Sequence, residues 1–277
     1  MFKITLRRLL KNKLATAGGI IFLIFLLAAI FAPLIAPYDY AEQDLYNTLA
    51  GPSLAHLCGT DEVGRDILSR LIYGGRYSIR IGILSVVLAA GIGVPLGAAA
   101  GFYGGRLDNV LMRFMDIFQA IPNLMLAIAL SATLGAGVNN CILALGITSM
   151  PAFARMTRAS ILNVRGMEYV EAARSTNSRD FRIIVKHVLP NAMAPLLVQA
   201  TMGVATAILN AASLSFIGLG VQPPLPEWGA MLSTGRTYIR DCWHMCVFPG
   251  LTIFLTVMSL NLFGDGLRDA LDPRMKN

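Results

Sequence analysis

The chain has 277 residues, of which 55% are hydrophobic and only 14% are charged, and its mean hydropathy is +0.61. Soluble globular domains carry about 25% charged residues, so this composition argues against an ordinary soluble enzyme or binding domain. The net charge of +7 indicates either a nucleic-acid partner or a membrane surface, and the positions of the basic residues decide between them.

Apolar runs along the chain predict six membrane-spanning helices of roughly 20 residues each. Residues 1–14 form a cytoplasmic arm, and the first span, 15–35, contains no charged residue. That run is too long for the apolar region of a signal peptide, so we expect a retained anchor. The other five spans cover about 81–102, 114–134, 138–154, 192–214 and 248–263. The sequence therefore predicts an all-α integral membrane protein, with five of its helices in a core of residues 81–264.

The basic residues set the orientation of these helices. If the N-terminus lies in the cytoplasm, 17 of the 23 Lys and Arg residues fall on the inner side. Positive charge gathers on the cytoplasmic side of membrane proteins, so both termini are predicted to be inside. This arrangement accounts for the positive balance without a nucleic-acid partner. It leaves outer segments at 36–80 and 215–247, an inner loop at 155–191 and a cytoplasmic tail at 265–277.

The outer segment 36–80 ends in a predicted interfacial helix. Its apolar stripe suits a helix that lies on the outer leaflet before the second span, and a surface helix that caps the bundle is an alternative. The stripe consists of Ile67, Leu68, Leu71 and Ile72. Acidic residues make this side negative and indicate either a docking surface or a solvated face; they are Asp39, Glu42, Asp44, Asp61, Glu62 and Asp66.

The inner loop 155–191 predicts two short helices on either side of a turn at 176–178. Asn177 tolerates the left-handed conformation that ends a helix, and Ser178 can cap the next one. The second helix places apolar residues on one face at helical spacing, namely Phe181, Ile184, Val185 and Val188. We expect Pro190 to stop this helix before the fifth span. The face could pack on the ends of the spans or lie on lipid, and a docking site for a cytosolic partner is the sharper hypothesis.

The outer segment 215–247 begins with a stretch rich in Gly and Pro. Irregular backbone near a membrane must line a cavity or pack within protein, so we expect a gate or re-entrant element here. The residues of this gate-like segment are Gly218, Gly220, Pro223, Glu227, Trp228 and Gly229. Trp228 could instead anchor the chain at the membrane interface.

Few polar residues fall inside the predicted spans. Asp116 lies at the inner end of the third span near Arg113 and either forms a local ion pair or lines a path. Asn210, Ser213 and Ser215 cluster at the outer end of the fifth span. They could contact a substrate or form hydrogen bonds between helices. The near absence of charge in the spans argues against a proton-coupled carrier.

The sequence Cys242-Trp243-His244-Met245-Cys246 holds four soft metal ligands within five residues. Its spacing matches no zinc motif, so we assign no metal site. Cys242 and Cys246 could instead form a disulfide or remain buried structural thiols, and Cys141 suits a small apolar position.

Particular segments resemble a known family. Glu171-Ala172-Ala173, followed by a turn and then Leu189-Pro190, is similar to the EAA loop of ABC importer permeases, in which Gly usually stands at the position of Asn177. Residues 59–74, 218–231 and 264–273 further resemble the C-type permease subunit of dipeptide, oligopeptide and nickel importers.

This resemblance covers essentially the whole chain and implies a type I permease core that forms half of a translocation path. It implies that residues 171–173, Asn177, Phe181, Ile184, Val185, Leu189 and Pro190 couple the chain to a cytosolic ATPase. It also implies three kinds of partner: a B-type permease, one or two ATPase subunits and an extracytoplasmic solute-binding protein. Di- or oligopeptides are the expected cargo, with nickel or a nickel chelate as the alternative.

The chain contains no Gly-x-x-x-x-Gly-Lys-Ser/Thr phosphate loop. We therefore expect no cofactor on this chain and no enzymatic activity of its own, with ATP and Mg²⁺ bound by the partner ATPase. A secondary carrier that works without an ATPase, and a membrane metalloenzyme built on the Cys/His cluster, are the competing functional classes.

Overall fold

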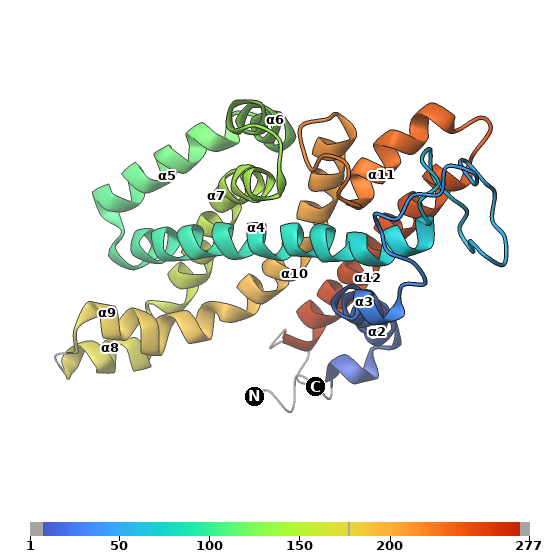
Figure 1. Cartoon of the computed structure of the whole chain (residues 1–277). Helices are drawn as coiled ribbons and strands as arrows, with labels where there is room; N and C mark the ends of the chain where they lie inside the picture. The colour runs from blue at the N-terminus through green and yellow to red at the C-terminus, as the bar shows by residue number, and fades with distance from the viewer. Residues whose placement is uncertain (1–7, 177, 272–277) are drawn as a thin grey trace.

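The computed structural model describes residues 8–176 and 178–271, and their fold is built from helices joined by irregular segments (Figure 1). The helices in chain order are α2 (Lys13–Ile30), α3 (Ala32–Ile35), α4 (Ile67–Tyr103), α5 (Gly105–Gln119), α6 (Asn123–Leu134), α7 (Val138–Val164), α8 (Glu168–Ser175), α9 (Asp180–Ile183), α10 (Leu189–Phe216), α11 (Trp228–Gly235) and α12 (His244–Leu271). A π-helical turn, Ile184–Val188, joins α9 to α10, and a 3-10 turn, Arg236–Tyr238, follows α11. The predicted all-α membrane class is confirmed.

Four helices in the described part of the chain are long and apolar enough to cross a membrane: α2, α4, the helix from α9 through α10, and α12. The pair α5 and α6 adds a fifth candidate, bent by 81° at its break. The fourth predicted span, 138–154, forms the first part of α7, a 27-residue helix. Its second half carries Arg155 and Arg158, so its composition is less apolar than that of the other spans.

The third predicted span differs from the expectation of one continuous helix. It is divided between α5 and α6 by a short break that ends at Pro122. Proline disfavours helical backbone at the residue before it, which ends the first helix at this point. The break turns α6 away from the direction of α5 (Figure 1).

The prediction of a separate interfacial helix before the second span is wrong. Asp66 caps a single helix, α4, that runs for 37 residues from Ile67 to Tyr103. Nothing between Leu68 and Ile81 interrupts helical backbone, and Ile67 and Leu71 are buried in protein rather than laid on lipid. The apolar stripe therefore packs inside the molecule.

The helices α4 and α7 form the central contact of the fold. A Cβ atom added at Gly97 would lie 2.2 Å from the carbonyl oxygen of Ala154, and one at Gly93 would lie 2.6 Å from that of Met150. Only glycine allows the two backbones to approach this closely, as is common between membrane helices.

Pro190 does not stop its helix, contrary to the prediction. The backbone continues from Asp180 to Phe216 as one helix. Proline lacks an N–H donor and its ring displaces the carbonyl of the residue four positions earlier, here Lys186. Lys186 lies within the π-helical turn, a local widening that accommodates such a displacement.

Candidate functional site

The inner loop presents an exposed apolar surface. Phe181 is 77% exposed and Val185 is 45% exposed, and the two lie one helical turn apart. The face predicted to hold four apolar residues is divided, because Val188 is fully buried and Ile184 packs partly inside. The second helix begins at Asp180 with Arg179 as its cap, not with Ser178. Asn177, predicted to form the turn, lies outside the described residues.

A hydrophobic cluster holds this surface in place. Ile183 and Val188 pack with Val170 of α8, Phe102 of α4 and Val164 of α7. Glu171 and Ala172 of α8 face solvent, and Ala173 packs partly against the same cluster. The exposed part of the inner loop is therefore connected to α4 and α7 through packed side chains. We call the four exposed residues Glu171, Ala172, Phe181 and Val185 of the inner loop the docking surface.

Arg174 of α8 stacks over the ring of Phe102, with its guanidinium carbon 5.1 Å from the ring centroid. Cation–π contacts of this kind contribute about 0.5–1 kcal/mol at exposed sites. An open hollow of 600 Å³ lies beside this contact and includes Arg165, Glu171 and Asp180 in its wall. The hollow has both acidic and basic walls, which suits a polar protein partner.

A second cavity, of 370 Å³, lies where the break between α5 and α6 faces α7 and α10. Its apolar wall includes Phe118, Ile121, Phe153 and Met202. The polar side chains in its lining are all uncharged: Gln119, Asn123, Thr148, Ser149, Gln199 and Thr206. We call it the amide-lined cavity. These residues were not predicted from the sequence, although the amides on either side of Pro122 were a usable signal.

The residues predicted to line a path do not line this cavity. Ser215 is buried and its hydroxyl oxygen accepts a hydrogen bond from the backbone N–H of Val221 at 3.1 Å. Ser213 donates to the carbonyl of Leu209 in its own helix. Asn210 lies on the outer half of α10. Two of these side chains thus serve local structure, because hydroxyls near a helix readily bond to its backbone.

Asp116 forms an ion pair, but with Arg155 of α7 rather than with the nearby Arg113. A second pair joins the same two helices, since Arg158 Nη2 donates to Asp108 Oδ2 at 2.6 Å and its Nε donates to the other carboxylate oxygen. These contacts fasten α5 to α7 on the inner side of the predicted membrane position. Two-point Arg–carboxylate contacts of this kind fix geometry as well as contributing energy.

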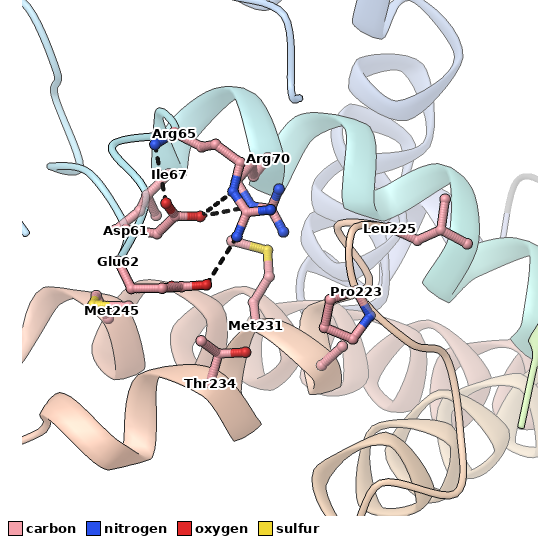
Figure 2. A pocket seen from close by; sticks show the side chains of 11 residues that line it. Asp61, Glu62, Arg65, Ile67, Arg70, Pro223, Leu225, Met231, Thr234 and Met245 are labelled. Atoms are coloured by element: carbon pink, nitrogen blue, oxygen red, sulfur yellow. Dashed lines mark hydrogen bonds and ion pairs between the residues drawn. The ribbon is translucent and has the colours of Figure 1, made fainter. Parts of the chain in front are cut away.

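Three of the six acidic residues in the outer segment, Asp61, Glu62 and Asp66, are paired and at least partly buried rather than part of a solvated face. Figure 2 shows Asp61 between the guanidinium groups of Arg65 and Arg70, at 2.6 and 3.4 Å, with Glu62 reaching Arg65 at 2.9 Å. The space among these side chains is only 20 Å³, and Pro223 and Met231 close it from the gate-like segment. Asp66 is also buried, caps α4 and lies 3.0 Å from His56. Of the six acidic residues considered for binding a partner on the outer side, only Asp39, Glu42 and Asp44 remain available.

The gate-like segment packs in protein, as expected for irregular backbone near a membrane. Trp228 is 1% exposed and donates from its ring nitrogen to the carbonyl of Leu71 at 2.9 Å, so its alternative role as an interfacial anchor is wrong. Glu227 is equally buried and caps α11. A Cβ added at Gly229 would lie 2.4 Å from Ala212 of α10. Gly218 adopts a positive φ of 83°, and a Cβ at Gly220 would meet Ser215.

The cysteines are free and buried, which contradicts the disulfide between Cys242 and Cys246. The thiol of Cys242 faces the carbonyl of Leu49 at 3.8 Å, and His244 Nε2 lies 3.3 Å from the carbonyl of Thr60. Among the described residues, no three His, Cys, Asp or Glu side chains are grouped closely enough to hold a metal ion. These side chains instead attach α12 and the turn before it to the outer segment.

Known proteins resemble the chain along its whole length. Residues 93–277 match the family described as binding-protein-dependent transport system inner membrane component, and residues 1–52 match the N-terminal TM domain of oligopeptide transport permease C.

Individual relatives extend this similarity. The dipeptide transport system permease protein DppC of Alkalihalophilus pseudofirmus is 47% identical over 271 residues, covering 98% of this chain and 89% of the relative. The di/tripeptide transport system permease protein DppC of Pseudomonas aeruginosa is 49% identical over 272 residues, covering 96% and 90%. The glutathione transport system permease protein GsiD of Pectobacterium atrosepticum is 44% identical, covering 98% and 90%.

The fold is also found in a solved transporter. A chain of the MetNI methionine ABC transporter in an inward-facing conformation superposes with a TM-score of 0.61 at 21% identity. The superposition covers 74% of this chain and 98% of that one.

Proposed function

The chain belongs to the binding-protein-dependent transport system inner membrane components and is an inner-membrane permease subunit of an ABC importer, and we propose that it carries di- or oligopeptides. The relatives that support this cargo are named for dipeptides, di- and tripeptides, and glutathione, and they cover nearly the whole chain. Its core of helices is that of a type I importer permease.

The observation that carries the coupling proposal is the docking surface. Phe181 and Val185 are exposed on the cytoplasmic side, where lipid does not cover them in the predicted orientation. Removing their exposed apolar area from water would favour association with a partner. We propose that a cytosolic ATPase receives this surface, and that Leu189 and Pro190 lie in the helix that carries the movement into the membrane. ATP and Mg²⁺ would bind only to that ATPase.

The amide-lined cavity is the proposed part of the path contributed by this subunit. Gln119, Asn123 and Gln199 each offer donors and acceptors, which match the backbone amides of a peptide. The lining contains no charged side chain, so the cargo would bind to it only weakly. Weak binding suits a transport path, because the cargo must be able to leave. A B-type permease would supply the facing half, and a solute-binding protein would deliver the cargo from outside.

In this mechanism the proposed gate-like segment closes the outer end of the path. The ATPase would move α8 and α9, the cluster around Val170 and Val188 would pass the movement to α4 and α7, and the cavity between α7 and α10 would open to one side at a time. The buried packing of Glu227 and Trp228 supports a closed outer end in the present conformation.

Reconstitution tests this function. The tagged chain would be purified from its own membrane with its co-purifying subunits, placed in liposomes, and assayed for ATP-dependent uptake of a labelled dipeptide in the presence of the binding protein. Uptake that an unlabelled tripeptide inhibits and Ni²⁺ does not would support the peptide proposal. Uptake of Ni²⁺ instead would overturn it while leaving the permease assignment in place.

The docking surface needs a separate comparison. Phe181→Asp and Val185→Asp are expected to reduce co-purification of the ATPase at least fivefold. Leu45→Asp is the matched control, because Leu45 is 71% exposed but lies in the outer segment. Equal recovery of the ATPase with all three variants would refute the coupling role of this surface.

A further inference from the structure

A groove between α2 and α4 lies outside every site described above. It has a volume of 280 Å³ and its walls combine apolar side chains with two arginines. The apolar wall consists of Leu26, Ala29, Ile30, Ile79 and Ile83, and the arginines are Arg76 and Arg80. The groove exists because the two helices cross tightly beside it, where a Cβ added at Gly75 would lie 3.0 Å from the Cβ of Ala29.

The two arginines occupy a predictable depth. Arg80 is followed by an uncharged stretch that reaches Phe102, which spans about 33 Å of helix and matches the hydrocarbon thickness of a bilayer. Arg80 therefore lies at the level of the outer headgroups, and Arg76 lies one turn, or about 5–6 Å, farther out on the same face.

Both guanidinium groups lack a partner within the described part of the chain. Arg65 and Arg70 in the same outer region form ion pairs with Asp61, and Arg236 stacks on the ring of Phe216. Arg76 and Arg80 are exposed and make no hydrogen bond or ion pair with any of residues 8–176 or 178–271. Arg240 is likewise exposed without such a partner, but only Arg76 and Arg80 lie together on a groove with apolar walls, and this combination points to an external anion.

We propose that this groove binds an anionic glycerophospholipid of the outer leaflet, with its phosphate on Arg76 and Arg80 and its acyl chains along Leu26, Ile30 and Ile83. Guanidinium groups bind phosphate oxygens at two points and are more weakly hydrated than ammonium groups, which suits this depth. The ammonium of a zwitterionic headgroup would be repelled by the second arginine. A headgroup with a net negative charge, such as phosphatidylglycerol, is therefore favoured.

Lipid binding in this groove is independent of the cargo and of ATPase coupling. Its consequence is that the first helix is held against the core partly by lipid, since the groove joins α2 to α4. Removal of the lipid would loosen α2 while leaving the docking surface unchanged.

The test compares two double variants of the complex purified with its partners in mild detergent. Arg76→Gln with Arg80→Gln removes the proposed phosphate ligands. Arg236→Gln with Arg240→Gln is the matched control, because it removes two outer arginines at the same spacing that do not line the groove. Bound lipids would be extracted and counted by mass spectrometry, and each sample would also be delipidated and heated with added phosphatidylglycerol, phosphatidylcholine or inorganic phosphate.

The wild type and the control are expected to retain phosphatidylglycerol, and the Arg76/Arg80 variant to retain at least fivefold less. Added phosphatidylglycerol should raise the melting temperature of the wild type but not of this variant. Equal retention by all three proteins would overturn the proposal, as would equal protection by inorganic phosphate, which would indicate a free anion. Loss of a co-purifying permease only from the Arg76/Arg80 variant would also overturn it, because the arginines would then bind a protein partner.

Discussion

Ser78 of α4 donates a hydrogen bond to Glu227 at 3.0 Å, although 149 residues separate them in the sequence. The other carboxyl oxygen of Glu227 accepts from the backbone N–H of Ala230 at 2.9 Å. One buried side chain thus caps α11 and ties the gate-like segment to the helix that carries the largest interface of the core.

Glu227→Ala is expected to release this segment. It leaves the Ser78 hydroxyl and the Ala230 N–H without their partner in a buried site, at a cost of about 2–4 kcal/mol. The variant should melt at a lower temperature in detergent and be cut faster by protease within residues 218–227. Glu42→Ala, at an exposed position of the outer segment, is the control and should change neither property.

Gly97→Ala should push α4 away from α7. The added methyl group would meet the backbone oxygen of Ala154 at 2.2 Å, and a backbone atom cannot rotate out of the way. Overpacking of this kind costs about 1–3 kcal/mol. Gly91→Ala, in the same helix with open space around it, should be neutral or slightly stabilising because alanine favours helix. Similar melting temperatures for the two variants would contradict the close contact of these helices.

The two ion pairs between α5 and α7 should differ in strength. Asp116 and Arg155 are about half exposed, so Asp116→Asn should cost only about 0–1 kcal/mol. Asp108 is mostly buried and accepts two hydrogen bonds from Arg158, so Asp108→Asn should cost about 1–3 kcal/mol. Melting in detergent at low and high salt separates them, since only the exposed pair should weaken clearly with salt. A larger loss with Asp116→Asn would reverse this ranking.

Cys58 in the outer segment should react slowly with maleimides. Burial, with a smaller contribution from the charge of Asp66, raises the pKa of its thiol. The folded state thus favours the neutral thiol, an effect present below the unfolded pKa and lost as the pH rises through the folded one. Ala55→Cys, in a Cys58→Ser background, offers an exposed thiol for comparison. The thiol introduced at position 55 should begin to react rapidly at a lower pH than Cys58 does. If the labelling rates of the two thiols depended on pH in the same way, a buried Cys58 would be contradicted.

Local sequence was sufficient for part of this fold. The uncharged run of residues 15–35 defined the first span, and the helical part of the inner loop through Ser175 was visible in its residue pattern. The positions at which helices break were harder to predict from the sequence. Pro122 follows the end of a helix, whereas Pro190 lies in a helix that continues, directly after a π-helical turn. Pro95 and Pro151 also lie inside helices, so a proline alone does not locate a break.

The site residues show the same division between local and long-range information. Phe181 and Val185 could be selected from helical spacing alone, and they are exposed. Their exposure and the burial of Val188 depend on where α8, α4 and α7 pack, which spacing does not contain. Likewise Asp61 and Arg70 look like surface charges in the sequence, and only the folded outer segment brings them together.

The uninterrupted helix from Asp180 to Phe216 has a mechanical consequence. At 1.5 Å per residue, its 37 residues form a beam about 55 Å long that reaches from the cytosolic surface to the outer half of the membrane. A rotation of 1° about one end displaces the other by about 1 Å, simply from this length. If a partner moves Phe181 as proposed, the stiffness of the π-helical turn would determine how much of that movement reaches Asn210. A substitution within Ile184–Val188 would then change how far the outer end of the helix moves for a given movement of its cytosolic end, without altering the residues at either end.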